Sequence, residues 1–385
     1  MLTRSGWGAI ALAVVSFLIG RVFGILELFV LGVGILAALA VAAFTMLQRP
    51  PRLAVRRLVE PSTVQAGDHA RVDVQIGNAG MRRSPVLQLW EPVGSAGGAT
   101  MNLAPLRPRE RSTAAYRLPT TTRGVVRIGP MRARRRDVLG LASRTFILPG
   151  ASELLVMPRH SPVRFNLGGA SGRLGDHLRM RAYGQSGSEF HSLRQYVIGD
   201  DLRRISWKAS ARSSEMIVKE TAIEGVKRCT VVLDLATTMD DDGFERAVSA
   251  AASLVTGAVL TGLNTRLVAL DTDLRGHDVA AVALRWLAVV QRGESGQLPS
   301  LKAGEGMGIV LVVTGTTADG CVAEVRASLG PDDVLVVVAC QSVGGHRDKF
   351  IVDATSDAAF ADSWTQLTGA MGSGQQLPAA YRTPA

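Results

Sequence analysis

Residues 230–235 read Thr-Val-Val-Leu-Asp-Leu, a short run that is apolar almost throughout. Further runs of this kind lie at residues 266–270, 309–313 and 334–339. Stretches with apolar residues at helical spacing lie between them, at residues 243–262, 279–291 and 318–329. Apolar strands that alternate with helices are typical of a parallel sheet covered on both faces. The sequence therefore predicts a doubly wound α/β domain over residues 229–369, with any ligand at the carboxyl ends of its strands.

Residues 187–212, which precede this domain, combine eight charged residues with a His, a Tyr and a Trp. They read Gly-Ser-Glu-Phe-His-Ser-Leu-Arg-Gln-Tyr-Val-Ile-Gly-Asp-Asp-Leu-Arg-Arg-Ile-Ser-Trp-Lys-Ala-Ser-Ala-Arg. Gly199 and Asp200 predict a turn, followed by a short helix from Leu202 that the Asp200 carboxylate caps. The mixed charges predict a local salt-bridge network, in which Tyr196 and Trp207 offer flat faces to arginine.

This segment resembles the signature of a bacterial family known only as domain-of-unknown-function family fifty-eight. The family pattern runs approximately Gly…Phe…Leu-Arg-x-Tyr-x-x-Gly-Asp-x-x-Arg-x-Ile-x-Trp…Ala-Arg, followed by a hydrophobic residue and Val-Lys-Glu, which residues 217–220 supply here. Residues 123–141 also resemble a stretch typical of the family. The candidate interaction or structural motif is Arg194, Tyr196, Gly199, Asp200, Arg204, Trp207, Lys208 and Arg212.

The resemblance implies a membrane-anchored protein with a von Willebrand factor A-like domain. It also implies a link with AAA+ ATPases of the MoxR type, and it implies no catalytic activity. The chain itself has no Gly-x-x-x-x-Gly-Lys-Ser/Thr loop, so ATP hydrolysis would come from a partner.

Three interpretations of the motif remain open. It forms a structural salt-bridge network, it is a docking surface for a partner, or it carries chemistry. In the last case Asp200, Asp201 and Lys208 would act in a metal-dependent hydrolase of an anionic substrate. His191 and Ser192 are adjacent and point apart, and no Gly-x-Ser-x-Gly elbow surrounds the serine. We therefore expect no catalytic residue.

A von Willebrand factor A-like domain binds Mg²⁺ through an Asp-x-Ser-x-Ser motif, together with a Thr and an Asp from later loops. Residues 234–238 stand at the position of this motif, so comparing them with it shows whether the metal ligands are present. Asp234 and Thr238 fit this pattern, but Ala236 removes one hydroxyl ligand, and Thr314 stands where an Asp is usual. Mg²⁺ requires several oxygen ligands. We expect no cofactor, with Mg²⁺ at a degenerate site as the alternative. In the metal-free reading Asp234 caps the adjacent helix, and Asp240, Asp241 and Asp242 complement a helix N-terminus.

Two apolar runs, at about residues 7–23 and 25–47, predict a transmembrane helical hairpin within residues 1–48. Glycines at positions 20, 24, 32 and 34 allow the helices to approach closely. The rival reading is a cleaved signal peptide, which would need a small-residue cleavage site after a single apolar core. Here Arg-Val-Phe-Gly follows the first run and hydrophobicity then resumes.

Flanking arginines predict the orientation. Arg4 precedes the first run, whereas Arg21 alone lies at the connection. Four arginines follow the second run, at positions 49, 52, 56 and 57. The positive-inside rule then places the bulk of the chain in the cytoplasm, as part of a multi-pass protein of the inner or plasma membrane. The odd number of cysteines, at positions 229, 321 and 340, also suits a reducing compartment.

Residues 53–165 predict a β-sandwich-like domain. Residues 71–76 alternate between polar and apolar positions, and a Gly-Asn-Ala-Gly turn follows them. Similar short runs recur between Pro and Gly, as in antiparallel sandwiches. Residues 166–228 are interpreted as a linker that contains the signature motif, and residues 370–385 as a disordered tail.

Charge divides the chain unevenly. Residues 1–230 carry 33 Lys and Arg against 15 Asp and Glu, whereas residues 231–385 carry 10 against 18. The basic part suits anionic lipid headgroups or an acidic partner, although arginine-rich codon usage is an alternative source. Arginines at positions 132, 134, 135 and 136 suggest a solvated strand, and we expect no nucleic acid partner. The sequence thus predicts a non-enzymatic adaptor on the lipid bilayer that presents substrates to a cytosolic MoxR-type ATPase.

Overall fold

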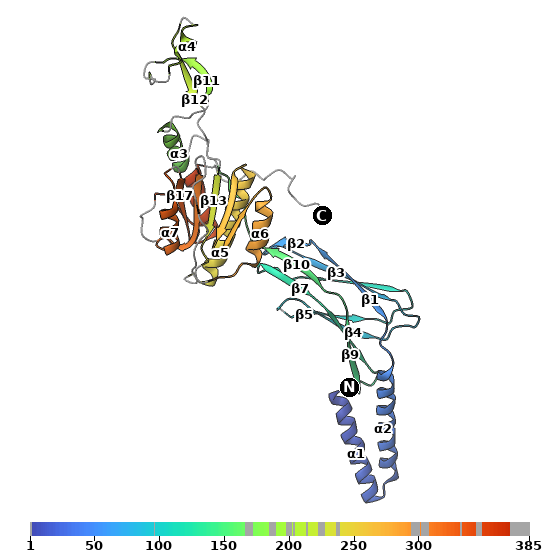
Figure 1. The fold of residues 1–385 in the computed structure, drawn as a ribbon. Coiled ribbons are helices and arrows are strands. Elements are labelled where there is room, and N and C mark those ends of the chain that lie inside the picture. Colours follow the sequence, from blue (N-terminus) through green and yellow to red (C-terminus); the bar gives the residue numbers. More distant parts are fainter. Residues whose placement is uncertain are drawn as a thin grey trace. The chain divides into compact units, whose positions relative to one another are not determined.

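The structure is a computed structural model, and it falls into two units, residues 1–157 and residues 158–385 (Figure 1). It describes residues 2–95, 97–165, 172–184, 190–197, 202, 205–212, 215–221, 228–235, 239–293, 301, 308–331, 333–343 and 349–369. Each unit has its own hydrophobic core.

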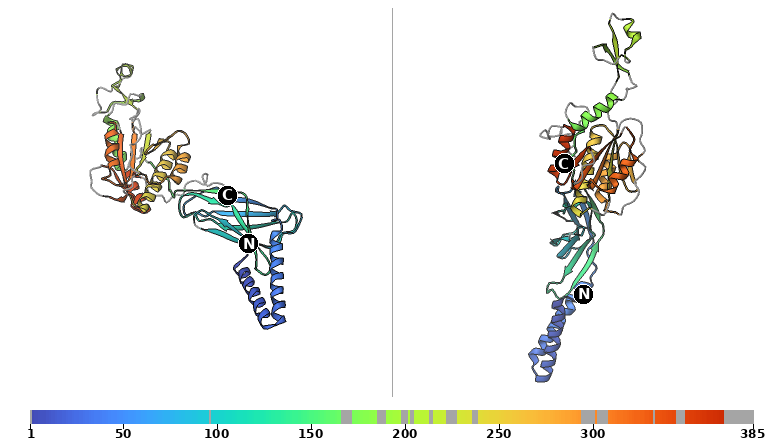
Figure 2. Two further views of the ribbon diagram at one scale, coloured as in Figure 1. Left: turned by 60° about the horizontal axis from the view of Figure 1, so that its bottom comes forward. Right: turned by 90° about the vertical axis from the view of Figure 1, so that its left-hand side faces the viewer.

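The first unit begins with two apolar helices, α1 (Arg4–Phe23) and α2 (Leu26–Leu47), which lie side by side (Figure 1, Figure 2). Thr3 caps α1 by accepting the Gly6 amide, and Gly24 ends it with a positive φ of 70°. Close approach depends on Gly32, where an added Cβ would lie 3.1 Å from the Phe17 ring. Both helices are long and apolar enough to cross a membrane by length and composition.

Ten short strands follow and form three sheets. Their bounds are β1 (Leu53–Glu60), β2 (Thr63–Gln65), β3 (Arg71–Asn78), β4 (Leu87–Pro92), β5 (Gly98–Leu103), β6 (Arg111–Arg117), β7 (Gly124–Ile128), β8 (Met131–Arg136), β9 (Ser143–Leu148) and β10 (Ser152–Met157). The sheet orders are β1-β3-β6, β2-β10-β7 and β5-β4-β8-β9. All described pairs here are antiparallel except β2 with β10.

One core serves all three sheets. The predicted alternation in β3 is confirmed, because Val72, Val74 and Ile76 point inward between exposed or half-buried neighbours. Leu87 from β4 and Leu154 from β10 join the same core. These sheets therefore enclose apolar side chains as the β-rich sequence predicts.

The second unit holds a six-stranded sheet with the order β15-β14-β13-β16-β17-β18. Its strands are β13 (Arg228–Leu233), β14 (Asn264–Ala269), β15 (Thr272–Arg275), β16 (Gly308–Thr316), β17 (Asp333–Ser342) and β18 (Ile351–Asp353). Its helices are α5 (Asp241–Leu260), α6 (Val279–Val289), α7 (Gly320–Ser328) and α8 (Asp357–Thr368). Strands β14, β13, β16, β17 and β18 are parallel, and β15 alone is antiparallel to its neighbour.

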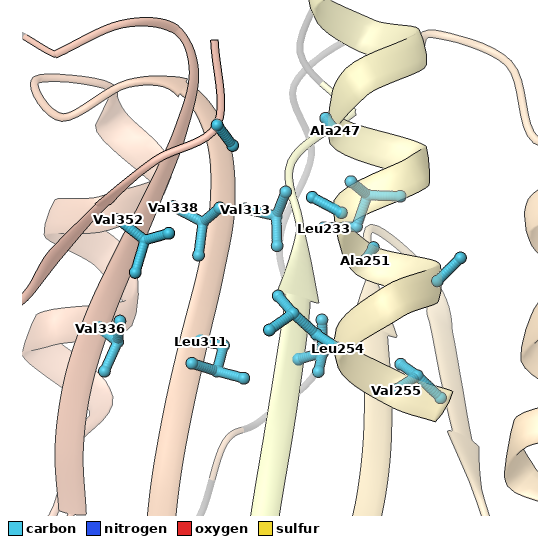
Figure 3. Close-up of a cluster of buried hydrophobic side chains, with 14 of the residues drawn as sticks. Leu233, Ala247, Ala251, Leu254, Val255, Leu311, Val313, Val336, Val338 and Val352 are labelled. Atoms are coloured by element: carbon cyan, nitrogen blue, oxygen red, sulfur yellow. The ribbon is translucent and has the colours of Figure 1, made fainter. Parts of the chain in front are cut away.

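Both faces of this sheet are buried. In Figure 3, Leu233, Leu311 and Val338 lie on the same face as Ala251 and Leu254 of α5. On the opposite face, the intervening strand residues pack against α7. The continuous apolar runs in the sequence thus reflect strands with no solvent-exposed face.

The connection before this sheet differs from the irregular linker that the sequence suggests. Residues 173–184 form helix α3 (Arg173–Gly184), and Leu174 and Leu178 insert into the α/β core. Phe165 enters the same core, and the boundary between the units follows Met157. Two leucines at i and i+4 suffice to bury one helix face, even where Gly and Arg dominate the composition. The expected tail, residues 370–385, lies outside the described residues.

Candidate functional site

A polar cluster lies at the carboxyl ends of β13 and β16, in the middle of the parallel sheet. The chain leaves β13 through α5 toward β14 and leaves β16 through α7 toward β17, on opposite sides. Ligands of open α/β sheets bind at this kind of topological switch point. Asp234 follows β13 directly, and its amide donates to the Val313 carbonyl at 2.9 Å. This bond sets Asp234 beside Thr314.

The Thr314 hydroxyl lies between two carboxylates. Its Oγ1 is 2.8 Å from Asp234 Oδ2 and 2.7 Å from Asp319 Oδ2. Asp234 is buried and Thr314 has no exposed surface. A hydroxyl has one proton and donates it to only one acceptor at a time. The arrangement therefore holds two acidic groups around one donor at a site largely shielded from solvent.

Asp319 also closes the loop after β16. It accepts the Thr316 amide at 2.7 Å and the Thr316 hydroxyl at 2.8 Å. Asp319 is the N-cap residue of α7, and its carboxylate binds back to Thr316 instead of capping the helix amides. The Thr-x-x-Asp spacing is visible in the sequence, but Asp319 is not among the predicted site residues, and Thr314 is noted there only as the replacement of a usual Asp.

The cluster gives this edge a negative field. Burial, and then the charges of Asp234, Glu324 and Asp319, raise the pKa of the Cys321 thiol to about 12. The thiol consequently stays protonated at neutral pH and is a poor nucleophile. Thr317 Oγ1 is also buried here, and it has no hydrogen-bond partner among the described residues.

The expected role of Asp234 as a helix cap is wrong. Asp240 caps α5 by accepting the Gly243 amide at 2.6 Å, and Asp241 and Asp242 lie in the first turn. The interpretation of these three residues as groups that complement a helix N-terminus is confirmed, with Asp240 as the cap and Asp241 and Asp242 in the first turn. Asp234 instead bonds across the sheet to Thr314, because the strand pairing brings the two residues level.

The donors of the cluster suit a hard cation in kind, since they are carboxylate and hydroxyl oxygens. Their number falls short, because the described residues hold no group of three or more acidic, His or Cys side chains in metal-binding range. Thr238 and Ala236 lie outside the described residues. We therefore derive no chemistry that passes through a metal.

The signature segment forms a small separate sheet. Strands β11 (Phe190–Gln195) and β12 (Ile217–Thr221) pair antiparallel, and Arg194 lies opposite Val218. The Tyr196 amide donates to the Met216 carbonyl, and the Ser206 amide to the Ile217 carbonyl, both at 2.8 Å. The expected helix from Leu202 is shorter and begins later, as the single turn α4 (Trp207–Ser210).

The described motif side chains divide into a buried pair and an exposed face. Ile205 and Val218 are buried and form an isolated bridge. Trp207 is 69% exposed, and Lys208 and Arg212 are exposed beside it in sequence.

Part of the motif remains a prediction. Gly199, Asp200, Asp201 and Arg204 lie outside the described residues. The salt-bridge network and the hydrolase set that depend on them therefore stay predictions.

Comparison with known proteins gives one family. The DUF58 family model, described as "Protein of unknown function DUF58", matches residues 192–275, from β11 to β15. The "Uncharacterized protein YeaD" of Bacillus subtilis (strain 168) is 26% identical over 161 residues. That alignment covers 42% of this chain and 40% of YeaD, so the chain matches less than half of its relative.

Solved structures give weak likenesses only. The CARDB domain of the PF1109 protein from Pyrococcus furiosus, in complex with di-metal ions, has 17% identity and a TM-score of 0.22. The match covers 28% of this chain and 96% of the CARDB domain. The putative ApaA protein from Bordetella pertussis has 17% identity and a TM-score of 0.19, with coverages of 28% and 96%. At these scores neither likeness carries an argument.

Proposed function

We propose that this chain, whose residues 192–275 match the DUF58 family model, is a DUF58 protein that acts as a membrane-anchored, non-enzymatic adaptor for a cytosolic AAA+ ATPase of the MoxR type. In this proposal unit two is a degenerate von Willebrand factor A-like domain that needs no cofactor. The protein would help the ATPase to assemble or mature a protein complex.

The observation that carries the docking role is the exposed face of the signature segment. Trp207 projects 69% of its surface to solvent, although burying such a side chain is strongly favourable. Large apolar residues of the same segment are also exposed, at Leu193, Val197, Leu202 and Met216. Aromatic and arginine side chains dominate the energetics of protein interfaces. A family motif that exposes them suits recognition of a partner better than packing.

The anchoring role is supported by the surfaces of α1 and α2. Only 22% and 17% of their most apolar windows are buried within the protein. A core helix of a water-soluble domain would bury its apolar face against other elements. A lipid bilayer covers such surfaces instead, and the arginines after Leu47 favour a cytoplasmic location for the rest of the chain.

The proposal is tested by co-purification with the MoxR-type ATPase of the same organism. The full chain is extracted from membranes in mild detergent, and the tagged ATPase is used to capture it. Trp207→Ala should reduce capture at least tenfold, because a buried aromatic anchor commonly contributes 2 kcal/mol or more to an interface. Leu260→Ala, which changes an exposed leucine at the end of α5, serves as the matched control.

Equal capture of wild type and Trp207→Ala would contradict the proposed docking surface. Turnover of phosphate or peptide substrates by the purified chain would contradict the non-enzymatic role. If that turnover requires divalent metal and is lost in Asp200→Asn, the hydrolase interpretation through Asp200, Asp201 and Lys208 replaces the adaptor.

A further inference from the structure

A groove of about 970 Å³ lies between helix α2 and the sheet β5-β4-β8-β9 within the first unit. Ala37, Val41 and Thr45 line its wall on α2, while Arg134 and Arg136 from β8 line the opposite wall. One wall is thus apolar and the other cationic. This pairing of surfaces matches a molecule with a hydrocarbon part and an anionic part.

The turn between β8 and β9 is fixed to the ends of both helices. The Thr3 amide, just before α1, donates to the Leu141 carbonyl at 2.9 Å. Arg144 Nη1 donates to the Met46 carbonyl at 3.0 Å, in the last turn of α2. An added Cβ on Gly6 would lie 2.2 Å from the Leu141 oxygen, so α1 and the turn are in close contact. In a membrane hairpin both of these helix ends lie at the same surface, and the groove therefore opens at that surface.

The same turn exposes two apolar side chains. Val138 is fully exposed and Leu139 is 64% exposed, and both line the groove. The Asp137 carboxylate, which also lines it, accepts the amides of Leu139 and Ala142 and so holds the turn. Apolar residues that project beside arginines are typical of segments that enter the headgroup region of a bilayer.

The arginines of β8 are available to an anion. Arg134, Arg135 and Arg136 form no ion pair with any residue that the structure describes. Arg134 has one hydrogen bond, from Nη2 to Ser143 Oγ at 3.3 Å. Guanidinium groups bind phosphate with two parallel hydrogen bonds, and adjacent cations strengthen that binding.

We propose that this groove is a binding site for an anionic phospholipid. The phosphate contacts Arg134 and Arg136, which lie on the same exposed face of β8, and an acyl chain follows the surface of α2 from Thr45 toward Ala37. Eight helical residues rise about 12 Å, which is the depth of a large part of one leaflet. The site rests on the proposed membrane anchoring, and it would fix the first β domain against the inner leaflet.

The test uses the full chain in nanodiscs of phosphatidylcholine and phosphatidylglycerol in equal amounts. Native mass spectrometry then counts the lipids that stay bound after the protein is released from the disc. Wild type should retain phosphatidylglycerol over phosphatidylcholine, and the variant Arg134→Gln/Arg136→Gln should lose at least fivefold of that enrichment. Ala37→Trp should also lower retention, because the indole fills the acyl path while the arginines remain.

The matched control is Arg117→Gln/Arg127→Gln, which removes two exposed arginines of the same unit outside the groove. It should keep the wild-type enrichment. Equal enrichment in the β8 variant, or no preference for the anionic lipid in wild type, would overturn the lipid site while the chain still inserts into nanodiscs. Failure of wild type to insert at all would instead overturn the anchoring on which the site rests.

Discussion

The two units bury polar groups in different ways. In the first unit Arg57 and Glu91 form an ion pair at 2.5 Å, with side chains 3% and 0% exposed. Glu91 also accepts the Tyr116 hydroxyl at 2.7 Å. In the second unit, Asp234 and Asp319 face one hydroxyl at the carboxyl edge of a parallel sheet.

This difference indicates that the polar cluster of the first unit has a structural role, whereas the cluster of the second unit is a candidate functional site. The first cluster pairs opposite charges and lies between strands β1, β4 and β6, although the buried Arg57 Nη2 has no hydrogen-bond partner among the described residues. Its effect on Tyr116 agrees, because burial and then the Glu91 hydrogen bond raise the pKa of the phenol above its ordinary value. The second cluster gathers like charges at the place where α/β sheets bind ligands. Only the second has the placement of a functional site.

The largest expected effect on stability is at the buried Arg57–Glu91 ion pair of the first unit. Glu91→Ala leaves the buried Arg57 charge uncompensated and should lower the free energy of unfolding by about 3–5 kcal/mol. Hydrogen exchange of the β4 and β6 amides in the full chain measures this loss. Glu153→Gln, which breaks an exposed pair with Arg127, is the control and should change the same value by less than about 1 kcal/mol.

A smaller loss of stability is expected at Thr314, at the carboxyl ends of β13 and β16. Thr314→Val removes the donor between the buried Asp234 and the half-buried Asp319 carboxylates, and it should lower the free energy of unfolding by about 1–3 kcal/mol, read from hydrogen exchange of β13 and β16. Thr256→Val, whose hydroxyl bonds only to the Ala252 carbonyl of its own helix, is the control.

We also expect Mg²⁺ to leave wild-type stability unchanged. Stabilisation by Mg²⁺ that disappears in Asp234→Asn would contradict the metal-free interpretation of this cluster.

The carboxylate of Asp273, also in the second unit, should make the stability of the protein depend on pH. Hydrogen bonds from Arg266 above all, at 2.7 and 2.8 Å, and then from Arg275, lower the pKa of Asp273 below its ordinary value. The stabilisation is therefore complete above about pH 4 and is lost as the pH falls through the lowered pKa. Asp273→Asn should cost about 1–2 kcal/mol at pH 7, and the difference from wild type should shrink toward pH 2.

Acid unfolding followed by circular dichroism gives this difference at each pH. Asp271→Asn, an exposed neighbour on the same turn, should show no such trend. A constant difference between wild type and Asp273→Asn from pH 7 to pH 2 would show that the Arg266 pair contributes nothing through ionisation.

The smallest effect on stability is expected in the signature segment. Trp207→Ala removes an exposed side chain and should change the free energy of unfolding by less than about 0.5 kcal/mol. Exchange of the β11 and β12 amides is the measurement. A loss of protection comparable to that of Thr314→Val would mean that Trp207 supports the fold of the segment, and its exposure would lose its meaning as a docking surface.

Periodicity predicted the elements whose burial is regular. The runs at 230–235 and 309–313 are apolar because helices cover both sheet faces, and the alternation at 71–76 marks one buried face. Helix α3 was not predicted, because two leucines among Gly and Arg residues give little helical periodicity of hydrophobicity.

The polar cluster escaped prediction for another reason. Asp234 and Thr314 are 80 residues apart in the chain, and only the pairing of β13 with β16 brings them together. Strand order is a tertiary property that one sequence specifies weakly. The exposure of Trp207 likewise depends on what lies around it, and its sequence context fits a salt-bridged core equally well.

In the proposed function, the hairpin holds the signature segment on the cytoplasmic side of the membrane. Lys208→Cys places a thiol on that exposed segment, and burial raises the pKa values of the native Cys229, Cys321 and Cys340 thiols, so their background reaction is slow. A membrane-impermeant maleimide is added to inverted and to right-side-out membrane vesicles. We expect the maleimide to label Lys208→Cys in inverted vesicles and not in right-side-out vesicles. The reverse pattern, or release of the chain from the vesicles by alkaline carbonate, would contradict the proposed function.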